Sequence, residues 1–294
     1  MEKIQYALLY AWVKMHALLP MRALYVLSDI MYFWIYRVLR YRIRVVRRNL
    51  ENAFPGKSPA ELRRLERDFY HHFADYLVET LKLMHISEKE LQARAYVTNP
   101  EFIDRLMEQG HTTFVVYMGH YGNWEWFSGS TTRFADLTMY QIYRPLTNKA
   151  ADRLFLTLRT RFGSRCMAKN ETVRDMVRLK QNRARALAIF LADQTPSRAN
   201  IHYWSEFLSQ DTPVYTGPER LARKLNFPVV YMDVVKKRRG YYEGTFRMLS
   251  EEPKELPEFA LTEKYIRLME QTILRNPAYW LWTHKRWKHK RETV

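Results

Sequence analysis

"TTFVVYMGHYGNWEW", Thr112 to Trp126, is the stretch of sequence that decides the fold. It opens with an apolar run of β-branched and aromatic residues, which is typical of a buried strand. Gly119 and Gly122 then permit a sharp turn, and a helix is predicted from about residue 123 to 133. His120 therefore follows directly on the end of a strand. Ligands bind at the carboxyl ends of strands in open α/β sheets, so this stretch predicts both a fold class and a site.

Strands and helices alternate along the rest of the chain. A capping box at Ser58–Glu61 opens a long helix that is predicted to end near Met84. Further strands are predicted at 138–145, 164–169, 186–193, 228–237 and 241–249, and further helices at 147–161, 171–181, 217–225 and 261–275. This alternation predicts an α/β fold, with a mainly parallel central sheet covered by helices.

The composition narrows the classes of partner. The 294 residues carry a formal net charge of +17, which predicts a polyanionic partner such as nucleic acid, anionic lipid or an acidic carrier protein. Aromatic residues make up 15% of the chain, a content that suits a membrane interface or a lipid cleft. Cys166 is the only cysteine, which excludes an internal disulfide and cysteine-based zinc sites. We expect a buried, inert thiol and neither a metal nor a cofactor.

The N-terminal segment, residues 4–39, is the most apolar part of the chain. Charged residues at 14, 22 and 29 interrupt every window of roughly 20 residues that could span a bilayer, and Pro20 divides the segment. The second half has a narrow polar stripe and a wide apolar face, which suits a helix lying in the headgroup region. The alternative is an ordinary core hairpin with a solvated, charged end.

Six arginines follow between Arg37 and Arg48. Basic residues beside an apolar segment are attracted to anionic lipids by roughly 1 kcal/mol each, which favours membrane association over the core hairpin. We therefore predict membrane-associating helices over residues 1–48 and an α/β domain over residues 49–294. Whether the N-terminal segment spans the bilayer or lies in its interface is left open by the sequence.

His120 and Glu125 are the predicted catalytic pair. A turn at the two glycines allows the imidazole and the carboxylate to meet, and a histidine bonded to a carboxylate can act as a general base through its other nitrogen. Because the chain lacks a GxSxG motif, the attacking hydroxyl is expected to belong to the substrate, without an acyl-enzyme. The alternative is a core histidine bonded to a nearby carboxylate.

"GHYGNWEW", residues 119–126, resembles the H-x4-D/E signature of glycerolipid acyltransferases, in the form carried by the lipid A secondary acyltransferases. The resemblance extends over nearly the whole chain, through "YRIRVVRRNLENAFPGKS", "QIYRPLTN", "FLADQTP", "TGPERLARKLNFPVV" and "NPAYWLWTHKRWK" in that order. Several blocks in the right order are far more specific than any one of them.

The resemblance implies an inner-membrane enzyme whose active site faces the cytoplasm. Such enzymes move a fatty acyl chain from an acyl thioester, typically of acyl carrier protein, to a hydroxyl on a phosphorylated glycolipid acceptor. His120 matches the family's base, Glu125 its carboxylate partner and Arg144 an arginine expected to contact phosphate. The predicted substrate-binding residues are Arg144, Asn123, Asp193 and Gln194.

One segment departs from the family pattern and bears on the acceptor. Pro196 and the "SRANIHYW" after it replace a glycine- and phenylalanine-rich loop of the family, which leaves open a lysophospholipid or a hydroxyacylated aminolipid as acceptor. The choice between carrier protein and coenzyme A as donor rests on the resemblance. Two basic runs, residues 284–291 and 236–239, are candidate docking surfaces for an acidic carrier or for lipid phosphates.

The sequence leaves two alternatives from other classes of function. A nucleic-acid-binding module would explain the charge, but it leaves the apolar N-terminus and the His120/Glu125 pattern unexplained, and no zinc-finger or RNP-like pattern is found. A catalytically silent lipid-binding protein is disfavoured by an intact histidine and glutamate.

Overall fold

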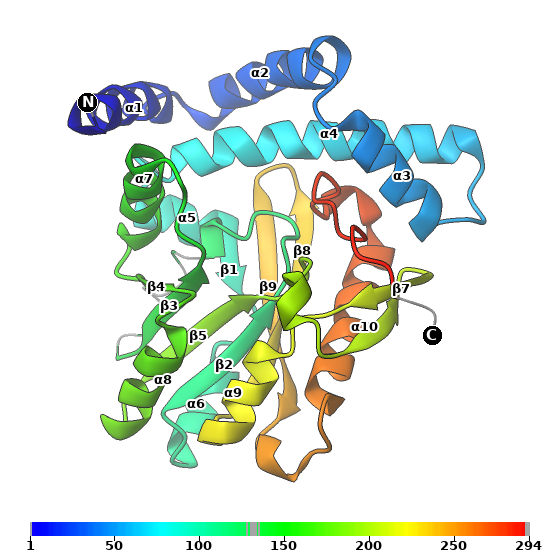
Figure 1. Ribbon diagram of the computed structural model, residues 1–294. Coiled ribbons are helices and arrows are strands. Elements are labelled where there is room, and N and C mark those ends of the chain that lie inside the picture. The colour runs from blue at the N-terminus through cyan, green and yellow to red at the C-terminus, as the bar shows by residue number, and fades with distance from the viewer. Residues whose placement is uncertain (1, 128, 130–133, 135, 292–294) are drawn as a thin grey trace.

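The computed structural model describes residues 2–127, 129, 134 and 136–291 and has a seven-stranded sheet at its centre (Figure 1). The strand order is β1-β9-β8-β2-β5-β3-β4, and all pairs are parallel except β8 with β9. The strands are β1 (Ala95–Val97), β2 (Thr113–Met118), β3 (Thr138–Tyr143), β4 (Arg165–Ala168), β5 (Ala186–Leu191), β8 (Val229–Arg238) and β9 (Tyr241–Ser250). The predicted α/β class and the mainly parallel sheet are confirmed.

Helices cover this sheet (Figure 1). They are α1 (Glu2–Ala17), α2 (Met21–Tyr32), α3 (Ile43–Ala53), α4 (Pro59–Lys82), α5 (Glu88–Arg94), α6 (Glu101–Glu108), α7 (Lys149–Thr160), α8 (Thr172–Gln181), α9 (Gly217–Leu225) and α10 (Ala260–Arg275). The capping box at Ser58 is present, with Glu61 N donating to Ser58 Oγ and Glu61 accepting from Ser58 N. A short hairpin of β6 (Trp204–Phe207) and β7 (Gln210–Pro213) stands apart from the main sheet.

The centre of the core is the pair β2 and β5. Every residue of β2 is buried, as are the first five of β5, which is why both read as continuous apolar runs in the sequence. Helix α10 packs on this sheet, and Tyr265 donates its hydroxyl hydrogen to the backbone oxygen of Met118 at 3.1 Å. This hydrogen bond anchors the end of β2, two residues before His120, to α10.

The N-terminal helices lie along one side of the molecule together with α4 (Figure 1). Helix α1 and the segment Met21–Val38, which is α2 continued by a π-helix, meet at an angle of 115°. At the bend, the buried Lys82 donates to the backbone oxygens of Ala17 and Leu19 at 2.9 and 2.8 Å. Within the described chain, no helix by itself has the length and apolarity to cross a bilayer; this bent pair meets both conditions only when taken together.

A single buried carboxylate connects these helices to the sheet. Glu79 of α4 is fully buried and accepts hydrogen bonds from Tyr25 of α2 at 3.0 Å, Tyr242 of β9 at 2.8 Å and Asn123 Nδ2 at 2.8 Å. The indole nitrogen of Trp126 donates to its backbone oxygen at 2.8 Å. Elements from three parts of the chain therefore meet at one side chain.

Candidate active site

The carboxyl ends of four neighbouring strands bring the polar residues of the site together. His120 follows β2, Asp193 and Gln194 follow β5, Arg144 follows β3 and Lys169 follows β4. The strand order is β2-β5-β3-β4 and all four strands run in the same direction. These residues therefore form a row at the carboxyl ends of the strands. The site is therefore at the sheet edge where the sequence predicted it.

His120 is held by Asp193. Its Nδ1 lies 2.7 Å from Asp193 Oδ1, and its backbone N–H donates to Asp193 Oδ2 at 3.0 Å. The indole nitrogen of Trp280 donates to the same Oδ2 at 2.7 Å. Burial alone would raise the pKa of the Asp193 carboxyl, but His120 and these hydrogen bonds outweigh it and lower the pKa to about 2. Asp193 is therefore an ionised carboxylate at neutral pH.

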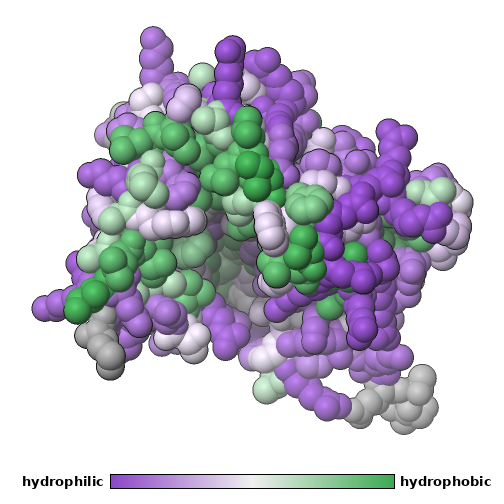
Figure 2. All heavy atoms as spheres, turned by 90° about the horizontal axis from the view of Figure 1, so that it is seen from above, coloured by the Kyte–Doolittle hydropathy of each residue, from purple (hydrophilic) through white to green (hydrophobic). Residues whose placement is uncertain are grey.

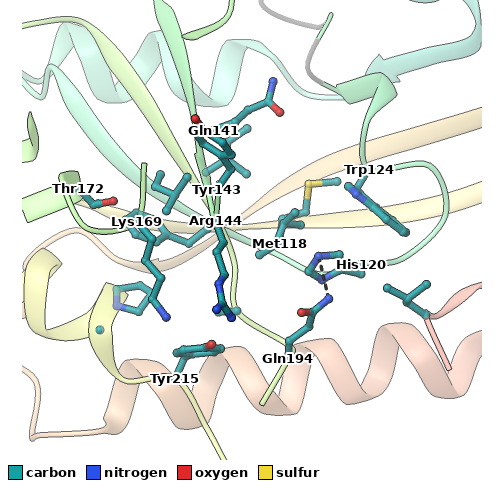
Figure 3. Close-up of a pocket in the computed structure, with 18 of the residues that line it drawn as sticks. Met118, His120, Trp124, Gln141, Tyr143, Arg144, Lys169, Thr172, Gln194 and Tyr215 are labelled. Carbon is teal, nitrogen blue, oxygen red and sulfur yellow. Dashed lines mark hydrogen bonds between the residues drawn. The ribbon is translucent and has the colours of Figure 1, made fainter. Parts of the chain in front are cut away.

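The other ring nitrogen of His120 faces Gln194. The side-chain nitrogen of Gln194 lies 3.2 Å from His120 Nε2 (Figure 3). An amide nitrogen only donates hydrogen bonds, so Nε2 is the acceptor and Nδ1 carries the proton that is shared with Asp193. The ring is in the tautomer that a general base needs, with its lone pair directed at the position of Gln194.

Glu125, in contrast, is paired with an arginine. Its two carboxylate oxygens accept from Arg159 of α7 at 2.8 and 2.5 Å, and its side chain is 2% exposed. The predicted hydrogen bond between His120 and Glu125 is therefore wrong, because the two ring nitrogens lie against Asp193 and Gln194 instead. The physical reason is local: the α-helix predicted from about residue 123 is absent over residues 123–127, where a turn at 124–125 and a 3-10 segment at 126–127 direct Glu125 toward α7. The rest of the prediction, to residue 133, falls largely outside the described residues. A catalytic role for Glu125 stays a prediction.

Two further sequence predictions concern the turn itself. Gly122 has φ of +62°, in the left-handed region that favours glycine. The prediction that this glycine permits a sharp turn is confirmed. Asn123 has no exposed surface; its amide donates to Glu79 and its oxygen accepts from Trp126 N at 3.2 Å. Asn123 therefore braces the turn from inside, and the substrate contact predicted for it has no support in this geometry.

A pocket of about 670 Å³ opens beside His120 (Figure 3). His120, Glu125 and Gln194 line it together with mostly apolar side chains. The apolar lining comes from several elements and includes Tyr76, Met118, Trp124, Ile142, Phe155, Ile189, Phe190, Leu221 and Leu281. Such a lining, with a few convergent polar groups, is typical of a ligand site, and here it suits a hydrocarbon chain.

Cations also line the pocket. Arg144 is among them, as the sequence predicted, and its contact with a phosphate stays a prediction. Lys288 belongs to the basic run 284–291 that the sequence predicted as a docking surface. Lys169 and Arg159 were missed, because each is brought to the pocket by an element whose position depends on the sheet order. Among the described residues, no group of three histidine, cysteine, aspartate or glutamate side chains could hold a metal ion.

The two basic runs have different environments. In the run 236–239, Lys236 and Arg239 pair with Asp75, and Lys237 pairs with Glu243. This run is therefore largely engaged within the protein, which weakens its prediction as a docking surface. The run 284–291 adds Lys288 and His284 to the pocket lining and places Arg286 in the interior, where burial lowers its pKa to about 10.

His284 predicts a pH dependence of stability. Burial lowers its pKa to about 4, and Arg286 acts in the same direction. The unfolded chain binds a proton at this residue below about pH 6.5, whereas the folded protein does so only near pH 4, so stability falls as the pH drops through this window. Burial also lowers the pKa of His72. Between pH 7.5 and 5.0, one such histidine lowers the free energy of unfolding by about 2 kcal/mol.

The measurement is denaturant unfolding of His284→Asn at these two pH values. We expect the variant to lose less stability on acidification than the parent protein, by about 2 kcal/mol. His85→Asn, a change at an exposed histidine, is the control and should keep the parent's pH dependence. Equal pH dependence in the His284 variant and its parent would contradict the assignment.

A search of curated proteins gave no match to the chain. The model of the family described as bacterial lipid A biosynthesis acyltransferase matches residues 1–289. The match covers nearly the whole chain and includes the His120 site, so the chain belongs to the bacterial lipid A biosynthesis acyltransferase family.

Proposed function

We propose that this acyltransferase moves a fatty acyl chain from a thioester, carried by acyl carrier protein, to a hydroxyl group of a lipid A precursor. His120 is the general base and Asp193 holds its ring. The reaction takes place at the cytoplasmic face of the inner membrane. Family membership supports acyl transfer in lipid A biosynthesis; the donor, the base and the location are the proposal.

The observation that supports this function most strongly is the His120–Asp193 pair at the wall of a mainly apolar pocket. A base next to an apolar cavity can bring a hydroxyl group and a fatty acyl thioester into contact. A carboxylate on Nδ1 stabilises the imidazolium that forms when Nε2 takes a proton. Without an adjacent cavity, the same hydrogen-bonded pair would indicate a structural histidine in the core.

The chemistry follows from this placement. The acceptor hydroxyl takes the place of the Gln194 amide at His120 Nε2 and gives its proton to that nitrogen as its oxygen attacks the thioester carbonyl carbon. The tetrahedral intermediate then collapses, the carbon–sulfur bond breaks, and the thiolate leaves with the proton from His120. The products are an ester on the acceptor and a free thiol on the donor, and the enzyme is regenerated.

An exposed apolar face supports membrane attachment. Of the described large apolar side chains that are exposed, thirteen of sixteen lie between residues 4 and 41. These are Ile4, Leu8, Trp12, Met15, Leu18, Leu19, Val26, Ile30, Phe33, Trp34, Val38, Leu39 and Tyr41, here called the apolar face. Seen from the side of α1 and α2, green apolar atoms gather around a hollow among polar ones (Figure 2). Patches of this kind mark membrane or partner contacts.

The apolar face is next to the pocket. Helix α1 packs on α7, with Tyr6 Oη 3.2 Å from Thr157 Oγ1 and the Arg153 guanidinium 4.2 Å from the centre of the Tyr6 ring. Helix α7 in turn lines the pocket through Phe155 and Arg159. A lipid acceptor can therefore reach His120 from a bilayer seated on α1. The arginines between residues 37 and 48, which follow this apolar segment, are exposed, so anionic headgroups would contact them.

This attachment predicts a large loss of membrane binding when the apolar face becomes charged. Leu8→Glu combined with Trp34→Glu is expected to reduce binding to phosphatidylglycerol vesicles at least tenfold, because two side chains that are more than half exposed no longer enter the bilayer. Flotation of purified protein with vesicles measures this. Leu274→Glu, at an exposed leucine of α10, is the matched control and should float like the parent. Unchanged flotation of the double variant would rule out this face.

The function is tested with purified protein, lauroyl or myristoyl thioesters of acyl carrier protein, and a panel of acceptors read by mass spectrometry. A lipid A precursor should gain the mass of one acyl chain. Gain on a lysophospholipid or a hydroxyacylated aminolipid instead would keep the reaction and change the acceptor. No acyl transfer to any hydroxyl acceptor would overturn the proposal.

A further inference from the structure

Besides Arg159, three cations line the pocket. Arg144 follows β3 and Lys169 follows β4, while Lys288 comes from the C-terminal segment. Figure 3 shows Lys169, Arg144 and Tyr215 on one side of the pocket, with His120, Met118 and Trp124 on the other. In the part of the chain that the structure describes, none of these three cations forms a salt bridge.

Other basic side chains that are buried or half-buried are paired with carboxylates. Arg159 is bound by Glu125, Lys236 by Asp75, and Arg275 by Asp233. The pocket has a second acidic lining residue, Asp152, whose Oδ1 accepts from the backbone N–H of Leu146 at 2.7 Å. Three cations that converge on one cavity repel each other, so a bound anion would remove an unfavourable interaction there.

Neighbouring groups favour an oxygen-rich anion. The Lys169 ammonium lies 4.9 Å from the centre of the Tyr215 ring, which holds the lysine against the pocket wall. Helix α9 begins beside it at Gly217, another lining residue, and adds the positive end of its dipole. An arginine fork with two ammonium groups suits a phosphate better than a single carboxylate.

The spacing from the base indicates which phosphate is bound. Strand β4 is three positions from β2 in the sheet, which corresponds to roughly 14 Å at about 4.8 Å per strand. A phosphate at Lys169 is therefore well separated from the carbon that reacts at His120. The thioester donor has this shape, because a linear pantetheine arm joins its sulfur to a phosphate. The arm is common to acyl carrier protein and coenzyme A.

The position of these cations in the molecule favours the phosphate of the donor over a phosphate of the acceptor. The first residues of α8 and α9 line the pocket beside Lys169, and the two helices extend from there toward the end of the molecule opposite α1 and α2 (Figure 1). An acceptor held in the bilayer presents its phosphates near the apolar face, whereas a donor delivered from solvent approaches from the far side. Resting on the acyl transfer proposed above, we propose that Lys169, Arg144 and Lys288 form the subsite for the phosphate of the donor's phosphopantetheine arm.

The test compares two donors that differ by this phosphate, lauroyl-phosphopantetheine and lauroyl-pantetheine, with one lipid A precursor as acceptor. For the parent protein we expect the phosphorylated donor to have a KM at least tenfold lower. Lys169→Gln combined with Lys288→Gln should reduce that ratio below threefold and leave the acceptor KM unchanged. Lys169→Arg should retain most of the preference. Lys254→Gln, at an exposed lysine outside the pocket, is the matched control.

Each other outcome is informative. A higher acceptor KM with an unchanged donor ratio would assign the cations to the acceptor's phosphate and overturn the proposal, as would a ratio that the double variant does not alter. Calorimetric binding of the two donors without acceptor separates this inference from the proposed function. If the parent transfers no acyl chain yet binds the phosphorylated donor more tightly, and the double variant loses this preference, the subsite stands and the function fails.

Discussion

Replacing His120 with alanine is expected to lower kcat for acyl transfer by about 10²–10⁴-fold, the usual contribution of a positioned general base. The imidazole is the group that takes the hydroxyl proton, and Gln194, its neighbour at Nε2, cannot do so because an amide is not a base at neutral pH. KM for the donor should change little, since the ring contributes only a small part of the pocket wall. Steady-state kinetics with acyl carrier protein thioesters provide the measurement.

The matched control is His85→Ala, at an exposed histidine that is not part of the pocket lining. Its kcat should stay within twofold of the parent value. An unchanged unfolding midpoint of the His120 variant would show that the loss is chemical. Activity of that variant within a few-fold of the parent would remove His120 as the base.

Asp193→Asn is expected to reduce kcat by a similar factor, about 10²–10⁴-fold, through the tautomer of His120. The backbone N–H of His120 and the indole N–H of Trp280 both donate to Oδ2, so the single oxygen of asparagine must occupy that position. The amide nitrogen then faces Nδ1 and donates to it. The ring proton moves to Nε2, where a lone pair is needed, and the base is lost without removal of any imidazole.

Nitrogen-15 NMR of labelled histidine follows this directly, because it reports which ring nitrogen carries the proton. We expect the protonated nitrogen of His120 to change from Nδ1 to Nε2 in the asparagine variant. Glu125→Gln gives the contrast: it leaves Arg159 without its carboxylate partner, so its main expected effect is a loss of about 3–5 kcal/mol in stability. A change of the His120 tautomer in the glutamine variant, and none in the asparagine variant, would restore the pairing predicted from sequence.

The sequence predicted the elements of the sheet well because each carries a local signal. The continuous apolar runs of β2 and β5 and the capping box of α4 are complete within a few residues, and the structure has all three. Short elements without such signals were missed, among them β1, which has three residues, and the hairpin β6–β7. Their strand structure depends on pairing with distant partners.

The partner of His120 was mispredicted for the same reason. Glu125 is five residues from the histidine and was the carboxylate that a local pattern could offer, whereas Asp193 is 73 residues away in sequence. The two meet because β2 and β5 are adjacent, which no periodicity in either strand encodes. Family resemblance placed Asp193 and Gln194 near the site, but their hydrogen bonds to the ring depend on the register of that strand pair.

Glu79 gives the molecule a mechanical property. One carboxylate joins the helix that carries part of the apolar face, the turn that follows His120 and the β8–β9 hairpin. A change in the position of α2 is therefore transmitted to the turn after His120 through buried hydrogen bonds to one carboxylate. Substitution of Glu79 would therefore loosen α2, the turn after His120 and β9 together, although none of these segments is near another in sequence.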